Sequence, residues 1–302
     1  MKTLIAARPY DFIKRSQDNP GRVVDFSDVV SFYELLPEAC RKVGIKCVIK
    51  DVPAKKIMPY GDQIYLGHHT KGQWRNCWHI KKGYLPGYLY FDKRGYSGWA
   101  ERNYDPTKTY PDMSHVWKQF RDNRVSKLDQ PTSANIPNEP YVLFLGQMPN
   151  DSVQDLAFVP MMRAEALVNR VVSQYCKVFT KPHPKAANLD YSAEIINGNL
   201  HDLIKGSSAV FTVNSGSGFE ALLHQKSVFT FGKSDYDWVT WAMLNEQMFE
   251  NVFDENFLGD RSGELIHNFL NYCFSEKFVD AYSVESICKK LQRTLDEYSE
   301  EF

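Results

Sequence analysis

The sequence predicts an α/β protein of two domains, each with a parallel sheet covered by helices. The chain has 302 residues, enough for two domains of about 150 residues each. Short β-branched and aromatic runs alternate with amphipathic helical patterns in both halves, which is the arrangement that builds parallel sheets. A polar, proline-containing stretch at 126–139 separates the halves and is predicted to be an interdomain linker.

The composition excludes several classes of protein. The formal net charge is −1, so any surface for nucleic acid or membrane would have to be local. The six cysteines contain no Cys-x-x-Cys pair, which favours reduced thiols over a disulfide framework or a zinc site. Apolar runs are too short for a signal peptide or for a bilayer span of about 20 residues. We therefore expect a soluble, cytoplasmic protein.

The first half begins with the expected alternation of strand and helix. Strands are predicted at residues 3–7, 47–50 and 64–66. A helix over 27–43 carries apolar residues at helical spacing, and Gly44 is a natural C-terminal stop for it. Pro37 lies inside this helix and should kink or divide it.

Residues 71–102 differ in character from the rest of the chain, with eight aromatic residues and seven Lys or Arg against two acids. Basic groups interleaved with rings suit stacking on bases or sugars, together with contacts to phosphates or carboxylates. The alternative is a core strand at 88–91 between solvated turns. The His68-His69 pair just upstream is too short to be a metal site by itself. The acceptor-binding candidates of this region are His68, His69, Lys81, Lys82, Tyr84, Lys93 and Arg94.

The second half repeats the strand-then-helix pattern. Strands are predicted at 141–145, 178–180, 209–213 and 227–231. Helices are predicted at 163–177, 219–223, 263–274 and 284–298, with a further short helix after the capping residue Asn199. One more helix is predicted at 113–121, before the linker. No sequence repeat links the two halves.

Several polar residues of the second half directly follow predicted strands, where parallel sheets bind their ligands. The loop at 214–218, Asn-Ser-Gly-Ser-Gly, leads into a helix whose free N–H groups and dipole favour a phosphate. The alternative is a plain structural turn. His183 lies between two prolines and Lys181 adds a cation nearby, so both residues suit a leaving phosphate.

Two carboxylates are candidates for chemistry or recognition. Asp151 suits a general base or a nucleophile on an anomeric carbon, and its structural alternative is a helix cap. Glu220 suits the hydroxyls of a ribose, or is simply an acid favoured in the first turn of a helix. Asp235-Tyr236-Asp237 matches a three-residue metal motif, but such matches are common by chance, and no metal is predicted.

Four motifs resemble those of the capsule polysaccharide synthesis family, which includes Kdo transferases. They are Lys181-Pro182-His183-Pro184, 213–223 (VNSGSGFEALL), 231–236 (FGKSDY) and 147–152 (QMPNDS). The resemblance implies a GT-B type fold, in which two Rossmann-like domains enclose a donor/acceptor cleft. It implies an acceptor-binding domain at 1–135 and a nucleotide-sugar-binding domain at 136–302, with a last helix that packs back on the first domain.

The resemblance also implies roles for individual residues. Asp151 matches the catalytic carboxylate of the family, and His183 is assigned to catalysis with it. The implied donor-nucleotide residues are Gln147, Ser152, Lys181, His183, Asn214, Ser215, Gly216, Ser217, Gly218 and Glu220. No cofactor is expected, because the nucleotide-sugar, CMP-linked or UDP-linked, is a substrate.

Three functions are compatible with these patterns. The first is a metal-independent glycosyltransferase that moves Kdo or a related acidic sugar to a hydroxyl of a bacterial surface glycan. The second is a phage-type DNA glycosyltransferase that modifies a hydroxymethylated base, which the segment 71–102 motivates. The third is a non-catalytic binding module, and the retention of both Asp151 and His183 argues against it. Lys81-Lys82 and Pro86-Gly87 depart from the family pattern, which leaves the sugar and the acceptor open.

Overall fold

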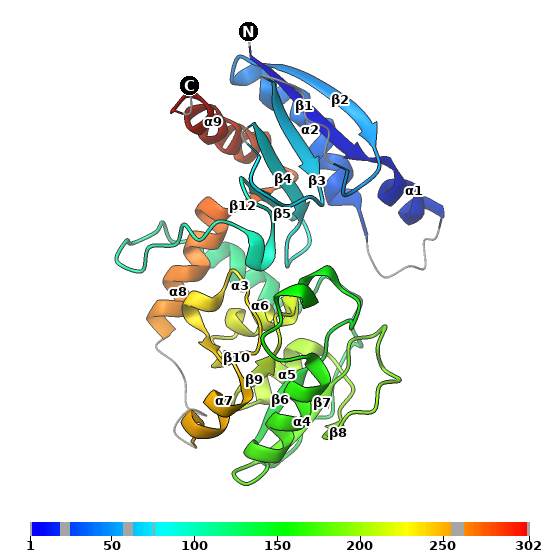
Figure 1. Cartoon of the computed structure of the whole chain (residues 1–302), viewed down its shortest axis with the longest axis vertical. Helices are drawn as coiled ribbons and strands as arrows, with labels where there is room; N and C mark the ends of the chain where they lie inside the picture. The colour runs from blue at the N-terminus through cyan, green and yellow to red at the C-terminus, as the bar shows by residue number, and fades with distance from the viewer. Residues whose placement is uncertain (1, 19–24, 57–62, 75, 255–262, 301–302) are drawn as a thin grey trace. The chain divides into compact units, whose positions relative to one another are not determined.

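The computed structural model describes residues 2–18, 25–56, 63–74, 76–254 and 263–300 of the chain. The chain forms two compact units, and each contains a six-stranded sheet (Figure 1). Unit 1 consists of Met1–Asn103 and Cys273–Phe302, and unit 2 is Tyr104–Tyr272. The predicted α/β fold with two mainly parallel sheets is confirmed.

The sheet of unit 1 has the strand order β12-β5-β4-β3-β1-β2 (Figure 1). Its strands are β1 (Thr3–Pro9), β2 (Lys46–Val52), β3 (Ile64–His68), β4 (Cys77–Lys82), β5 (Tyr88–Asp92) and β12 (Phe278–Asp280). Strands β2, β1, β3 and β4 are parallel, whereas β5 and β12 run antiparallel to their neighbours. The last strand of this sheet therefore comes from the far end of the chain.

Two long helices of unit 1 pack against each other and build the larger core of this unit. The helical elements are α1 (Tyr10–Asp18), α2 (Ser27–Lys42), η1 (Ser97–Trp99), the π-helix η5 (Cys273–Lys277) and α9 (Val284–Glu300). Val29, Phe32 and Leu36 of α2 recur at helical spacing and are fully buried. The helix continues through Pro37, so the predicted division of α2 does not occur.

The sheet of unit 2 is entirely parallel, with the order β11-β10-β9-β6-β7-β8. Its strands are β6 (Tyr141–Leu145), β7 (Lys177–Lys181), β8 (Glu194–Ile195), β9 (Val210–Thr212), β10 (Val228–Thr230) and β11 (Trp241–Ala242). The central strands β6 and β9 are fully buried, as expected for a parallel sheet that is covered on both faces.

Helices alternate with the strands of unit 2 and complete its core. They are α3 (Ser114–Asp122), η2 (Ser152–Leu156), α4 (Met161–Val172), α5 (Leu200–Gly206), α6 (Gly216–Leu223), η3 (Asp237–Val239), α7 (Glu246–Val252) and α8 (Gly263–Tyr272). The rings of Phe211 and Phe229 stack at 4.6 Å between β9 and β10, and Phe249 of α7 packs edge-on against Phe231. Among the described residues, no helix combines the length and apolar character needed to cross a membrane.

The boundaries of the units differ from the predicted boundary at 135/136. The ring of Tyr104 packs on Phe269 of α8, and the Met113 backbone N–H donates to Asn271 Oδ1, so residues from 104 onward belong to unit 2. The predicted linker at 126–139 also lies within unit 2. The end of the chain belongs to unit 1, because β12 pairs with β5 and α9 packs on α2.

Four strands of the described residues were not predicted from the sequence: β4, β12 and the two-residue strands β8 and β11, which are too short to show a periodicity. β4 lies within the basic and aromatic segment, where its three polar residues out of six favoured an assignment to turns. It is nevertheless a central strand, paired with β3 and β5. β12 has three residues and follows a helix directly, so it has no periodicity of its own.

Candidate functional site

The carboxyl ends of β6 and β9 mark the switch point of the unit 2 sheet. From β6 the chain moves outward through β7 and β8, and it then returns to β9 on the other side of β6. The loops that follow two such strands run in opposite directions. Ligands of open α/β sheets bind in the crevice that this leaves outside the carboxyl ends of the strands. The donor-site candidates follow β6, β7 and β9, so they gather at one edge of one sheet.

Gln147 and Asn214 bridge this switch point. Gln147 Nε2 donates to Asn214 Oδ1 at 2.8 Å, and the Asn214 backbone N–H donates to Gln147 Oε1 at 3.3 Å. The Asn214 amide also donates to the Val153 and Lys233 carbonyls, at 2.8 and 3.3 Å. Both side chains are buried. They hold the two loops together. Their contact with a donor, which the resemblance implies, stays a prediction.

The loop 214–218 forms the N-terminus of α6, as predicted. Ser215 Oγ caps the helix by accepting the Ser217 backbone N–H at 3.3 Å, and it lies 2.8 Å from Ser217 Oγ. The Tyr236 hydroxyl donates to the Ser215 carbonyl at 2.6 Å. A Cβ on Gly218 would lie 2.6 Å from that hydroxyl, so a side chain there would force the hydroxyl to shift. Two hydroxyls thus meet at a helix N-terminus, an arrangement that suits an anion.

His183 follows β7 and lies against the end of β6. A Cβ on Gly146 would be 3.1 Å from the His183 backbone nitrogen. His183 Nδ1 accepts the Lys185 backbone N–H at 3.1 Å, so Nε2 carries the proton of the neutral ring. Burial and the charge of Lys185 lower the pKa of His183, and the negative charge of Asp151 opposes them. His183 is therefore mostly neutral at pH 7 and offers an N–H donor.

Asp151 lies on the loop after β6, near enough to His183 for its charge to act on the imidazole. Its carboxylate is exposed. Oδ1 accepts the Val153 backbone N–H and the Ser152 hydroxyl, both at 3.3 Å. Asp151 is thus the N-cap of η2, the structural alternative that the sequence left open. Capping fixes the Asp151 side chain through one oxygen, and the other oxygen stays available for chemistry.

Lys181 and Glu220 lie on the inner side of the same region. Lys181 Nζ donates to the Gly198 carbonyl at 2.9 Å. Burial lowers the pKa of Lys181, whereas the charge of Glu220 raises it. Glu220 is 4% exposed, and its Oε2 accepts a hydrogen bond from Ser126 and lies 3.3 Å from His201 Nε2. Neither Ser126 nor His201 was singled out from the sequence, because one lies in the supposed linker and the other on an ordinary short helix.

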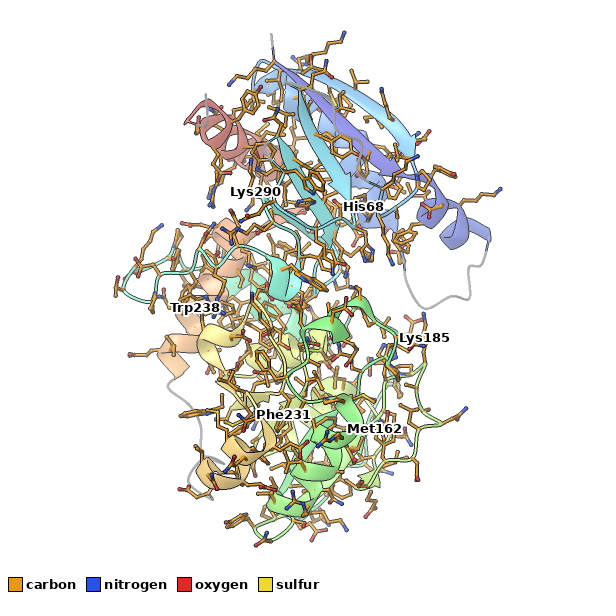
Figure 2. The ribbon with its side chains drawn as sticks, in the orientation of Figure 1. His68, Met162, Lys185, Phe231, Trp238 and Lys290 are labelled. Carbon is orange, nitrogen blue, oxygen red and sulfur yellow. The ribbon has the colours of Figure 1, made fainter. Side chains whose placement is uncertain are left out.

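Three of the seven acceptor candidates are buried inside unit 1, and their burial argues against direct contact with an acceptor. His68, at the end of β3, is 2% exposed (Figure 2), and burial together with the charges of Lys81 and Lys82 lowers its pKa to about 3. Lys82 Nζ forms an ion pair with Asp28 at 2.9 Å. Tyr84 is 7% exposed. These side chains support the fold of unit 1.

Lysines of the basic segment lie over aromatic rings of the same unit. Lys81 Nζ is 3.7 Å from the centre of the Tyr96 ring, and Lys93 Nζ is 3.8 Å from the Trp78 ring. Such cation–π contacts stabilise a folded surface without any ligand. In the described part of this segment, these contacts give Lys81 and Lys93 a structural role within the unit, and the DNA alternative gains no support from them.

The two remaining acceptor candidates, His69 and Arg94, are not buried. His69 has a φ of +54°, uncommon for a residue with a side chain, and its ring packs edge-on against Phe12 and Tyr96. The Arg94 side chain is exposed. Both stay acceptor candidates. Within the described part of the chain, no group of three or more His, Cys, Asp or Glu is arranged to hold a metal ion.

Residues 160–280 match the family model described as "Capsule polysaccharide biosynthesis protein". The resemblance predicted from the sequence is confirmed. The matched range takes in His183 and the loop 214–218, and it begins after Asp151. No match to this chain was found among curated proteins.

Two solved structures of similar architecture come from Thermosulfurimonas dismutans KpsC. The beta Kdo 2,4 transferase has a TM-score of 0.54 at 16% identity, covering 87% of this chain and 88% of that one. The beta Kdo 2,7 transferase has a TM-score of 0.46 at 14% identity, covering 97% and 99%. The first likeness shows the GT-B type fold. At this identity the likeness concerns the fold alone.

Proposed function

We propose that this protein transfers a sugar from a nucleotide-activated donor to a hydroxyl of a bacterial surface glycan, and that unit 2 binds the donor. The observation that carries the proposal is the convergence of Asp151, His183 and the Ser215–Ser217 pair at the switch point of one parallel sheet. Kdo or a related acidic sugar, CMP-linked or UDP-linked, is the proposed donor. A cytoplasmic location, where nucleotide-sugars are made, stays a prediction.

The donor phosphate is assigned to the N-terminus of α6. Ser215 and Ser217 supply hydroxyl donors, and the aligned peptide dipoles of the helix supply partial positive charge. Lys181, at the end of β7, is assigned as a further positive charge for this phosphate. These groups stabilise the negative charge that grows on the phosphate as its bond to the sugar breaks. With these charges in place, the proposed reaction uses no metal and no cofactor.

His183 and Asp151 are the proposed catalytic pair. The bond between the anomeric carbon and the phosphate oxygen breaks, and neutral His183 donates a hydrogen bond to the departing phosphate from Nε2. Asp151 acts in one of two ways. As a general base it takes the proton of the acceptor hydroxyl while the acceptor oxygen bonds to the anomeric carbon. As a nucleophile it first forms a covalent bond to that carbon as the phosphate leaves; the acceptor oxygen then displaces the carboxylate, and the hydroxyl proton passes to the departed phosphate.

A glycan is preferred over DNA as the acceptor. The segment that motivated the DNA alternative places Lys81 and Lys93 over rings of its own unit, and Lys82 in a buried ion pair. His69 and Arg94 are the acceptor-side residues that this proposal retains. An affinity for duplex DNA that falls steeply as salt is added would favour the DNA alternative.

The test separates binding from chemistry. Thermal stabilisation by CMP, UDP and GDP identifies the nucleotide, and turnover is then measured with the matching nucleotide-sugars, with and without EDTA. We expect Asp151→Asn to lower turnover about 100-fold or more while leaving nucleotide affinity unchanged, and Ser217→Ala to weaken the affinity. Asp155→Asn, an acid on the same short helix, is the matched control. The assignment fails if Asp151→Asn turns over like the wild type, or if no nucleotide stabilises the protein.

A further inference from the structure

The Tyr236 side chain packs against the N-terminus of α6. Tyr236 lies in the loop after β10, and its side chain is fully buried within unit 2. The hydroxyl donates to the Ser215 carbonyl at 2.6 Å, and a Cβ on Gly218 would lie 2.6 Å from the same hydroxyl. The ring lies 6.5 Å from the ring of Phe219. One side chain from outside the helix thus meets both the cap and the first turn of α6.

The loop that carries Tyr236 is itself fixed by hydrogen bonds. Asp237 Oδ1 accepts the Ser234 backbone N–H at 2.9 Å and the Ser234 hydroxyl at 2.6 Å. The Lys233 backbone N–H donates to the Leu156 carbonyl at 2.8 Å. Burial raises the pKa of Tyr236 well above its ordinary value, so the hydroxyl keeps its proton and remains a donor. Tyr236 therefore presents a fixed donor to the Ser215 carbonyl.

The position of the Ser215 carbonyl determines where the next N–H group points. The carbonyl accepts the Tyr236 hydroxyl, and it also accepts the Gly218 backbone N–H at 3.0 Å. The peptide bond between Ser215 and Gly216 is trans, and the C=O and N–H groups of a planar trans peptide point in opposite directions. Because the carbonyl is held towards the helix and Tyr236, the Gly216 N–H points outward from the N-terminus of α6.

The Gly216 N–H is a donor that the loop does not use for itself. The Ser217 backbone N–H donates to Ser215 Oγ, and the Gly218 backbone N–H donates to the Ser215 carbonyl. Among the described residues, none accepts the Gly216 N–H. N–H groups of this kind, which have no partner within the helix, are the ones that bind phosphates at helix N-termini. A phosphate held by the two serine hydroxyls would therefore accept this N–H too.

We propose that Tyr236 is a positioning residue of the donor site, whose hydroxyl holds the Ser215 carbonyl so that the Gly216 N–H faces the donor phosphate. The inference rests on the proposed function for the identity of the ligand, the phosphate of a nucleotide-sugar. The hydrogen bond that carries the inference can be measured without a ligand, so the two can fail separately.

NMR of the ligand-free protein tests the hydrogen bond. An HNCO spectrum of the deuterated, ¹³C,¹⁵N-labelled protein correlates the Gly216 N–H with the Ser215 carbonyl carbon, and the signal is assigned by its displacement in Gly216→Ala. We expect Tyr236→Phe to move this carbonyl signal. Tyr141→Phe is the matched control, because it removes another buried hydroxyl of unit 2 that donates to a backbone carbonyl, at 2.7 Å. An unchanged signal in Tyr236→Phe would overturn the inference.

Nucleotide binding shows whether the held carbonyl serves a phosphate. Calorimetric titrations compare CMP with cytidine and UDP with uridine. We expect Tyr236→Phe to weaken binding of the nucleotide by about 3–10-fold, the loss of one hydrogen bond, and to leave the affinity for the nucleoside, which has no phosphate, unchanged. Tyr141→Phe should change neither affinity. An unchanged nucleotide affinity in Tyr236→Phe, or an equal loss for the nucleoside, would contradict the positioning role.

Turnover with the nucleotide-sugar gives a second measure of the same role. Negative charge grows on the phosphate as its bond to the sugar breaks, so a misdirected Gly216 N–H should lower kcat as well as raise KM. Wild-type kcat and KM in Tyr236→Phe would contradict the inference. If neither CMP nor UDP binds the wild type, the proposed function fails, and the HNCO spectrum still decides whether Tyr236 holds the Ser215 carbonyl.

Discussion

Lys82 Nζ lies 2.9 Å from the Asp28 carboxylate, and the two side chains are 9% and 2% exposed. The ion pair joins β4 to the first turn of α2 inside unit 1, and the Lys82 ammonium also donates to the Asp25 carbonyl. The Gly87 backbone N–H donates at 3.3 Å to Asp28 Oδ2, an oxygen that Lys82 also approaches. The interaction therefore joins a strand, a helix and a loop that are distant in the sequence.

Removing one partner of this buried pair should destabilise unit 1 strongly. Lys82→Met leaves the Asp28 carboxylate buried without its counter-ion, at an expected cost of about 3–5 kcal/mol in the free energy of unfolding. Amide hydrogen exchange of β4 in increasing urea reports this change. Arg8→Gln is the control, because the Arg8–Asp51 pair is 43% and 51% exposed and should contribute about 1 kcal/mol or less. Equal losses of stability in Lys82→Met and Arg8→Gln would contradict the structural role of the Lys82–Asp28 ion pair.

The buried His68 should make unit 1 sensitive to acid. Burial holds the pKa of His68 at about 3, well below the value of about 6.5 in an unfolded chain. Between these values the unfolded state binds the extra proton, so stability is lost as the pH falls below about 6.5, at up to about 1.4 kcal/mol per pH unit. The change in urea midpoint between pH 7 and pH 5 should shrink in His68→Gln. The same substitution at His267, which is 37% exposed, should have no such effect.

The titration of His183 should respond to its two charged neighbours in opposite directions. Asp151 raises the pKa of His183 and Lys185 lowers it. Asp151→Asn should therefore lower the pKa of His183 further, and Lys185→Ala should raise it towards its ordinary value. NMR of the imidazole, with the signal assigned by its loss in His183→Gln, measures both shifts. If neither neighbour moves the titration, Asp151 and His183 do not form the proposed pair.

Adding a single methyl group at Gly218 should show how closely the Tyr236 hydroxyl approaches this residue. In Gly218→Ala the new Cβ would meet the Tyr236 hydroxyl at 2.6 Å and Thr212 Cγ2 at 3.0 Å. We expect a destabilisation of about 1–3 kcal/mol and weaker nucleotide binding, because the Tyr236–Ser215 hydrogen bond must shift. Removing the hydroxyl in Gly218→Ala/Tyr236→Phe should recover part of the stability. Gly263→Ala, where the nearest atom is 3.6 Å away, is the matched control. Melting temperatures of the three variants and the wild type, measured by calorimetry, test this expectation.

The sequence by itself determined the local structure and the family resemblance. Asn199 and Ser215 are N-caps, as their residue types predict, because capping depends only on the next three residues. Long periodic segments such as α9 were predicted for the same reason. The placement of Asp151, His183 and the loop 214–218 after strands also follows from local pattern, and in a parallel sheet such loops share one edge.

Only the tertiary structure decided which neighbours these residues have. β4 is a central strand because β3 and β5 pair with it, and its Lys82 is buried because Asp28 of α2 lies opposite. The stretch 126–139 was predicted as a linker from its composition, yet its contacts with Asn199 and Glu220 bring it into unit 2. Contacts between polar side chains that lie 54 or 94 residues apart leave no periodic trace in a sequence, since they depend on the path of the whole fold.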